Sequence, residues 1–138
     1  MVGWLGAAQK RALEAEAARY GEFLGLAATV VLAPGRQAYV AHYHLLEEEQ
    51  LLVLEGRPTL RLGERRIPME PGSYVVFPAG QKAGHALVNE TDEPVRYLII
   101  GERNPNEVTV HTDTGRVGVR LVGEGYRMGD SVDYWDGE

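Results

Sequence analysis

Two of the four histidines in this chain stand two positions apart, in His42-Tyr43-His44. Residues at this spacing in a β-strand point to the same side of the sheet, so both imidazoles can face one interior. The glutamates 47–49 follow closely, and His85 comes after a Pro-Ala-Gly turn. Imidazoles and one carboxylate form a ligand set that suits one divalent ion such as Zn, Mn, Fe, Ni or Co. Such a set leaves positions open for a further ligand.

The composition describes an ordinary globular protein. The chain has 138 residues, of which 44% are hydrophobic and 25% are charged, and this length predicts one domain. A net charge of -6 without a run of Lys and Arg argues against nucleic-acid binding. The chain has no cysteine, which excludes disulfides and thiolate sites and fits a reducing compartment. No apolar run is long enough to cross a bilayer. We therefore expect a cytoplasmic protein without membrane or nucleic-acid partners.

The elements expected to position these ligands are mostly short strands. Residues 1–24 are rich in helix formers and predict a short N-terminal helix or arm. After this arm, short β-rich runs alternate with Gly and Pro at intervals of roughly ten residues, which predicts an antiparallel jelly roll. We expect a barrel over residues 25–123 and a C-terminal tail, 124–138, that packs on it. The strand candidates are 26–32, 37–45, 50–55, 59–62, 74–77, 85–88, 95–101 and 117–122.

The spacing of these residues resembles two motifs of the cupin superfamily, in its small single-domain bacterial form. Gly35, His42, His44, Glu49 and Gly56 resemble the first motif, and Gly72, Pro78, Gly80, His85 and Asn89 resemble the second. Two intervals are longer than in the family pattern, from Gly35 to His42 and from Gly80 to His85. The resemblance implies an all-β double-stranded β-helix that binds one divalent metal ion. It also implies the four metal ligands, which are His42, His44, Glu49 and His85.

Other residues near these ligands are candidates for lining a pocket. By strand parity, Val40 shares a face with the histidine pair, Leu51 and Val53 share one with Glu49, and Leu87 lies between His85 and Asn89. Lys82, in the longer loop before His85, is a candidate for attracting an anionic group at the pocket mouth. The remaining polar neighbours have simpler interpretations. Asn89 is expected to form hydrogen bonds at a strand end, Glu47 and Glu48 to be solvated, and His111 to be a surface or packing residue.

The resemblance implies two classes of function and does not choose between them. One is a metal-dependent enzyme that acts on a small organic molecule, since cupins with this ligand set include oxygenases, isomerases, epimerases and decarboxylases. The other is a non-catalytic module that binds or senses a small ligand. A storage-type barrel is a weaker third interpretation, because the chain is small. Jelly-roll barrels expose sheet edges that often pair across a two-fold axis, so we expect a homodimer.

Overall fold

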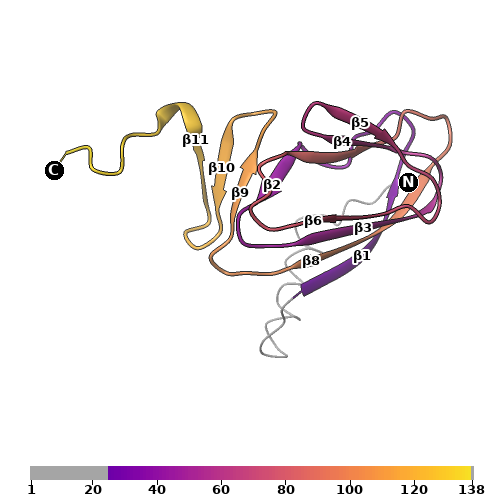
Figure 1. Ribbon diagram of the computed structural model, residues 1–138, viewed down its shortest axis with the longest axis horizontal. Coiled ribbons are helices and arrows are strands. Elements are labelled where there is room, and N and C mark those ends of the chain that lie inside the picture. Colours follow the sequence, from indigo (N-terminus) through magenta and orange to yellow (C-terminus); the bar gives the residue numbers. More distant parts are fainter. Residues whose placement is uncertain (1–24, 138) are drawn as a thin grey trace.

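The computed structural model describes residues 25–137, whose regular elements are antiparallel strands apart from one short 3-10 turn (Figure 1). The expected N-terminal arm, residues 1–24, lies outside the described residues. Among the described residues, no helix is long and apolar enough to cross a membrane. The strands are β1 (Gly25–Leu32), β2 (His42–His44), β3 (Glu49–Glu55), β4 (Thr59–Leu62), β5 (Arg65–Pro68), β6 (Tyr74–Phe77), β7 (His85–Val88), β8 (Val95–Glu102), β9 (Val108–His111), β10 (Arg116–Val119) and β11 (Glu124–Arg127), followed by a 3-10 turn, η1 (Met128–Asp130).

The strands form two sheets that face each other (Figure 1). The smaller sheet has the order β1-β8-β3-β6, and the larger has the order β11-β10-β9-β2-β7-β4-β5. Strands adjacent in the chain often belong to different sheets, so the chain crosses repeatedly between them, as in a double-stranded β-helix. The all-β antiparallel fold expected from the sequence is therefore confirmed.

The apolar core fills the space between the sheets. Side chains of a strand alternate between its two faces, and in β3 this places Leu51 and Val53 inside, where they are 4% and 1% exposed. From β8, Val95 and Tyr97 reach the same interior. The core also contains Leu32, Ala38, Leu60, Met69, Phe77 and Leu87. The core is thus built from strands of both sheets, including β3 and β7, which carry the candidate ligands Glu49 and His85.

The strands expected from the sequence agree with the structure in most places. Residues 59–62, 74–77 and 85–88 form strands with the predicted bounds. The strand expected over 37–45 is shorter, because it begins only at His42 after a bend. Three strands that were not predicted, β5, β9 and β11, complete the larger sheet.

The end of the chain projects from the barrel. β9, β10 and β11 continue the larger sheet outward, and the chain after β11 runs further away from the two sheets (Figure 1). Every residue from 121 to 137 is exposed. Of the tail expected over 124–138, residues 124–127 form β11 and pair with β10, whereas residues 128–137 are exposed.

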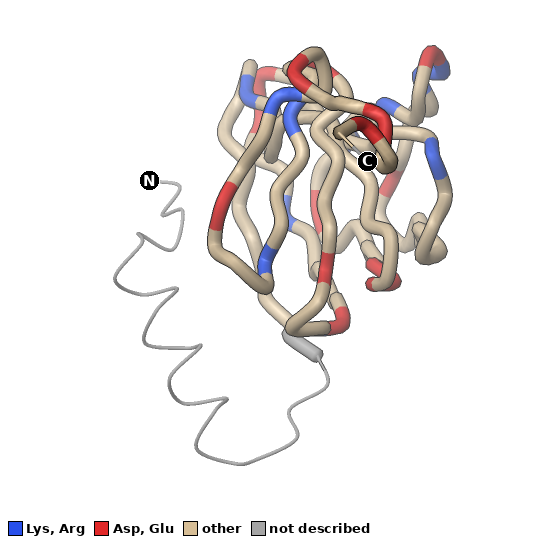
Figure 2. Tube along the Cα trace, turned by 90° about the vertical axis from the view of Figure 1, so that its left-hand side faces the viewer, with Lys and Arg blue, Asp and Glu red and all other residues tan. Residues whose placement is uncertain are grey.

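Charged residues of both signs are spread over the barrel. Figure 2 shows Lys and Arg positions interspersed with Asp and Glu positions along the described trace. Several of them form ion pairs across strands, such as Arg61 with Asp113 at 3.0 Å. This mixed distribution differs from the basic stripe that nucleic-acid binding requires.

A tight turn after β3 depends on Gly56. Its φ of +84° lies in the left-handed region that disfavours side chains. A Cβ atom there would also lie 2.8 Å from Val95 Cγ2 and 2.9 Å from the Pro94 carbonyl oxygen. Gly72 has a similar φ of +90° but nothing within 4 Å of the corresponding position.

We expect Gly56→Ala to destabilise the protein clearly more than Gly72→Ala. Both variants bear the left-handed backbone cost of about 1–2 kcal/mol, but only Gly56→Ala adds overpacking against Val95, of about 1–3 kcal/mol. Urea unfolding of both variants and the parent measures the difference. Equal losses would show that the contact with Val95 and Pro94 does not constrain the turn.

Candidate metal centre

All four histidines of the chain gather on one face of the larger sheet. His42 on β2 lies opposite His85 of β7 on one side and opposite His111 of β9 on the other. Residues directly opposite each other on neighbouring strands project to the same face. His44, two residues along β2, shares this face as well. The register of three short strands therefore produces a group of four imidazoles.

Glu49, the first residue of β3, reaches this group from the smaller sheet. Its Oε2 atom lies 2.8 Å from Nε2 of His85, 3.7 Å from Nε2 of His44 and 3.8 Å from Nε2 of His42. The same nitrogen of three imidazoles thus faces one carboxylate oxygen. The structure brings together the four residues that the cupin resemblance implied as ligands.

Contacts behind the imidazoles fix their orientation. His42 Nδ1 lies 2.8 Å from the Val40 carbonyl oxygen, an acceptor that favours a proton on Nδ1 and leaves Nε2 free. The His85 ring stacks on Phe77 with a centroid distance of 3.7 Å and an interplanar angle of 3°.

The electrostatics of the group follow from this convergence. Burial alone would raise the pKa of Glu49, but the three facing imidazoles outweigh it and hold that pKa well below its ordinary value. Burial lowers the pKa of His85 and is opposed only in part by Glu49. Burial also acts to lower the pKa of His44, but the carboxylates of Glu49, Glu107 and Glu47 together raise it. Glu49 therefore carries a negative charge toward which a cation is attracted.

One unsatisfied atom of the site matches what a cation needs. Nε2 of His44 is buried without a hydrogen-bond partner, a condition that normally costs about 1–3 kcal/mol. The side chains of His42, His44 and Glu49 keep 12%, 13% and 23% exposure, so the centre is not completely closed off from solvent. His42, Glu49 and His85 each offer a ligand atom close enough to share one ion, and Nε2 of His44 faces the same oxygen. These residues fit one divalent metal ion with open positions.

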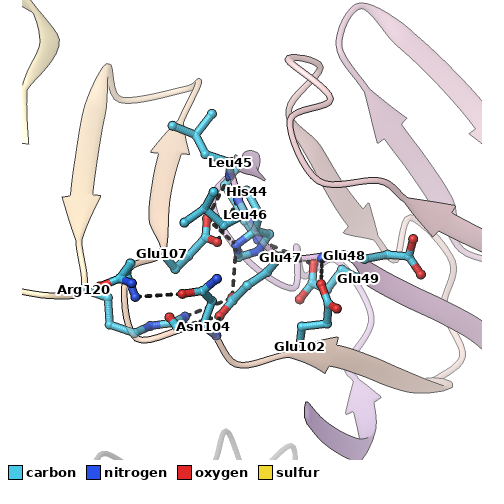
Figure 3. A network of polar contacts seen from close by, with 12 residues as sticks. His44, Leu45, Leu46, Glu47, Glu48, Glu49, Glu102, Asn104, Glu107 and Arg120 are labelled. Atoms are coloured by element: carbon cyan, nitrogen blue, oxygen red, sulfur yellow. Dashed lines mark hydrogen bonds and ion pairs between the residues drawn. The ribbon is translucent and has the colours of Figure 1, made fainter. Parts of the chain in front are cut away.

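A second polar group lies behind His44 (Figure 3). Nδ1 of His44 is 3.6 Å from Glu47 Oε2 and 3.5 Å from Glu107 Oε1. The expectation that Glu47 is a solvated turn residue is wrong, because Glu47 is only 4% exposed and forms an ion pair with Arg120. Glu107, buried at 1% exposure, was missed, since nothing in the surrounding sequence marks it.

The expected pocket-lining residues have varied positions. Leu51, Val53 and Leu87 belong to the apolar core. Val40 is 41% exposed, and Lys82 is exposed on the loop between β6 and β7. Asn89 is fully buried, and its side chain donates hydrogen bonds to the carbonyl oxygens of Leu32 and Glu93. The Asn89 side chain thus links the end of β1, at Leu32, to the segment that leads into β8.

An arrangement of two antiparallel sheets with a His/Glu group between them defines a metal-binding type of jelly roll, and comparisons with known proteins give its family. The sequence model of the cupin domain matches residues 28–101. The chain is 31% identical to a sugar phosphate isomerase of the cupin superfamily from Silicibacter pomeroyi, over 87% of this chain and 78% of that chain, with a TM-score of 0.73. No curated protein matches the sequence. This chain belongs to the cupin family.

Two further solved structures are similar. A proposed sugar phosphate isomerase from Acidithiobacillus ferrooxidans is 28% identical over 85% of this chain and 76% of that chain, with a TM-score of 0.76. A polyketide cyclase from Streptomyces resistomycificus, 23% identical over 62% of this chain and 58% of that chain, has a TM-score of 0.53 and shares the fold alone.

The metal centre predicts a difference between two histidine variants. His42→Ala should reduce bound metal from about one ion per chain to near zero, whereas His111→Ala, which removes an imidazole from the neighbouring strand, should retain it. Added metal should stabilise the parent by about 2.7 kcal/mol when free metal is 100 times its Kd, and His42→Ala by far less. Elemental analysis and thermal unfolding measure both effects. Equal metal content in the two variants would contradict the assignment.

Proposed function

We propose that His42, His44, Glu49 and His85 hold one divalent metal ion, and that the chain is an enzyme that isomerises a phosphorylated sugar. The observation that carries this proposal is the convergence of three Nε2 atoms within 3.8 Å of Glu49 Oε2. The names of the Silicibacter and Acidithiobacillus proteins, which are similar over most of both chains, support the choice of substrate. The fold itself does not choose a reaction, since unrelated chemistries share it.

The four ligands would place the substrate carbonyl at the open side of the centre. When bound, a divalent ion polarises such a carbonyl and stabilises negative charge on its oxygen. Isomerisation then moves one proton from a carbon to the adjacent carbon and a second proton from the hydroxyl oxygen of the first carbon to the carbonyl oxygen of the other, and needs no oxidant or reductant. The partial exposure of His42 and Glu49 gives a small substrate access to this side.

His111 is our candidate for moving the proton between the carbons. It lies opposite His42, faces the same interior, and its ring centroid is 5.9 Å from that of His42. Burial, followed by the neighbouring imidazoles of His42 and His44, lowers the pKa of His111. A neutral imidazole near pH 7 accepts a proton from carbon and returns it to the next carbon.

Lys82 is our candidate for the phosphate group. Its loop is joined to β2 by a hydrogen bond of 2.8 Å from the Gly80 amide to the His44 carbonyl oxygen, and the loop leads directly into His85. The exposed ammonium group on this loop would attract an anionic group of a substrate bound at the centre.

The isomerase proposal is tested with a panel of aldose and ketose phosphates and the corresponding unphosphorylated sugars. In D2O, the metal-loaded parent should interconvert one phosphorylated pair and exchange its transferred proton for deuterium, both of which are observed by NMR. Glu49→Gln should lose metal and turnover together, His111→Ala should keep metal but lose turnover by about 10²–10⁴-fold, and Lys82→Ala should raise KM for the phosphorylated substrate.

Each failure has a separate meaning. A metal-loaded parent that neither interconverts nor exchanges any phosphorylated sugar would overturn the isomerase and leave a metal-dependent binding module. Full turnover in metal-free protein would overturn the role of the centre. An unchanged rate in His111→Ala would remove that residue from proton transfer.

We further propose that the projecting end of the chain contacts a second copy in a homodimer. Among the strands of residues 25–137, β11 is an edge strand that pairs only with β10, and an exposed edge is open to pairing with another chain. The exposed apolar side chains after it include Val132, Tyr134 and Trp135, at 74%, 87% and 67% exposure. A surface hollow of about 700 Å³ is lined by residues of β10, β11 and η1, and a second copy provides both an edge and aromatic side chains to fill it.

A chain ending at Arg127 should be monomeric where the full chain is dimeric, because the deletion removes the exposed aromatic and apolar side chains. Light scattering after gel filtration measures the mass of each, and circular dichroism with metal content verifies that the shortened chain is folded. Leu121→Ala, which removes an apolar side chain that is 68% exposed before β11, is the matched control and should stay dimeric. A monomeric full chain, or a dimeric shortened one, would contradict this contact.

A further inference from the structure

Glu107 is a buried carboxylate that lies outside the four candidate ligands. It directly precedes β9, and its side chain is 0% exposed. Its two oxygens accept hydrogen bonds from the backbone amides of Leu45 and Leu46, at 2.8 and 3.0 Å. The same Oε1 atom lies 3.5 Å from Nδ1 of His44. A charge this deeply buried is costly unless it is paired, and the imidazole of His44 faces it.

Glu47 approaches the same nitrogen from another direction and is itself neutralised. Its Oε2 atom lies 3.6 Å from His44 Nδ1 and 3.1 Å from Nη2 of Arg120. Arg120 also pairs with Oε1 of Glu47 and donates a hydrogen bond of 2.7 Å to the carbonyl oxygen of Asn104. The backbone amide of Asn104 donates a hydrogen bond to the Glu47 carboxylate as well. Figure 3 shows these side chains arranged as one connected group behind His44.

The group is poorly suited to a second cation, although His44, Glu47 and Glu107 lie close enough to share one. Arg120 already supplies positive charge to Glu47, and both oxygens of Glu107 accept backbone hydrogen bonds. A cation at Nδ1 together with one at Nε2 would require His44 to lose both ring protons. A proton on Nδ1 satisfies the same carboxylates without this cost.

We propose that Glu107, supported by Glu47 and Arg120, is a positioning residue that keeps a proton on Nδ1 of His44 and so presents Nε2 to the metal. This inference rests on the proposed metal centre. A neutral imidazole carries one proton, and a carboxylate facing Nδ1 selects the form whose Nε2 lone pair is free. The charged acceptor also makes Nε2 a stronger donor to the metal. His42 has the equivalent arrangement with a neutral acceptor, the Val40 carbonyl oxygen.

Apart from Glu47, the positioning group comes from a part of the chain beyond the matched cupin domain. That match ends at residue 101, whereas Asn104, Glu107 and Arg120 follow it. Glu107 precedes β9, which pairs with β2 and places Thr109 opposite His44. Arg120 follows β10, the next strand of the same sheet. The extension of the larger sheet, formed by β9, β10 and the residues beside them, would therefore act on the metal centre through Nδ1 of His44.

The decisive variant is Glu107→Gln, with Glu102→Gln as its matched control. Glu102 also accepts a backbone amide hydrogen bond, from Glu48 at 2.7 Å, but its carboxylate is not among the groups that face His44. Glu107→Gln should weaken Zn²⁺ binding by about 10–100-fold while the saturated protein still holds one ion. Glu102→Gln should stay within about 2-fold of the parent, because it removes only an exposed carboxylate. Competition with a chromophoric zinc chelator measures the affinities.

Nitrogen NMR of the histidine-labelled, zinc-loaded parent tests the same proposal without a variant. His44 should show a protonated Nδ1 and a zinc-bound Nε2, and its Nδ1 resonance should shift in Glu107→Gln but not in Glu102→Gln. Zinc on Nδ1, two zinc ions per chain, or equal affinities of the two variants would each overturn the positioning role. A parent that binds no zinc would instead overturn the metal centre itself, so the two failures are distinguishable.

Discussion

The structure depends on the pairing register of a strand only three residues long. β2 places His42 opposite His85 and opposite His111, and this pairing puts imidazoles from three strands on one face. A slip by one residue would turn both histidines of β2 to the outer face of the sheet and bring Tyr43 inside. A strand this short makes few hydrogen bonds of its own. Its register therefore has to be held by contacts around it, such as the Glu107 carboxylate that fixes the amides of Leu45 and Leu46.

A polar group between two sheets is stable only if its charges are balanced locally. Glu49 is balanced by three imidazoles and Glu47 by Arg120, so neither carboxylate is buried alone. Because the imidazoles hold the pKa of Glu49 far below its ordinary value, this carboxylate stays ionised as the pH falls. Protons that compete with a metal therefore act on the histidines, which must be neutral to bind it.

Sequence patterns predicted the parts of this protein that depend on local spacing. The His-x-His pair fixes a shared face, and short β-rich runs bounded by Gly and Pro located 59–62, 74–77 and 85–88 as strands. β5 was missed because its residues, Arg65 to Pro68, are mostly exposed and lack the apolar alternation that marks a strand. Glu47 was misjudged because its partner, Arg120, lies 73 positions along the chain. Contacts at such separation are created by the fold and leave no mark in the neighbouring residues.

The two regions around the centre have different roles in determining its chemistry. The matched cupin domain, residues 28–101, supplies the four candidate ligands, and a ligand set of this kind is compatible with many reactions. Residues after 101 supply the imidazole of His111 beside the centre and the carboxylate of Glu107 behind it. If the roles that we propose for Glu107 and His111 hold, the extension of the larger sheet sets properties that distinguish one metal site from another, such as the donor strength of a ligand and the nearest proton acceptor. Among proteins that share the barrel, differences in this extension are therefore a physical basis for differences in reaction.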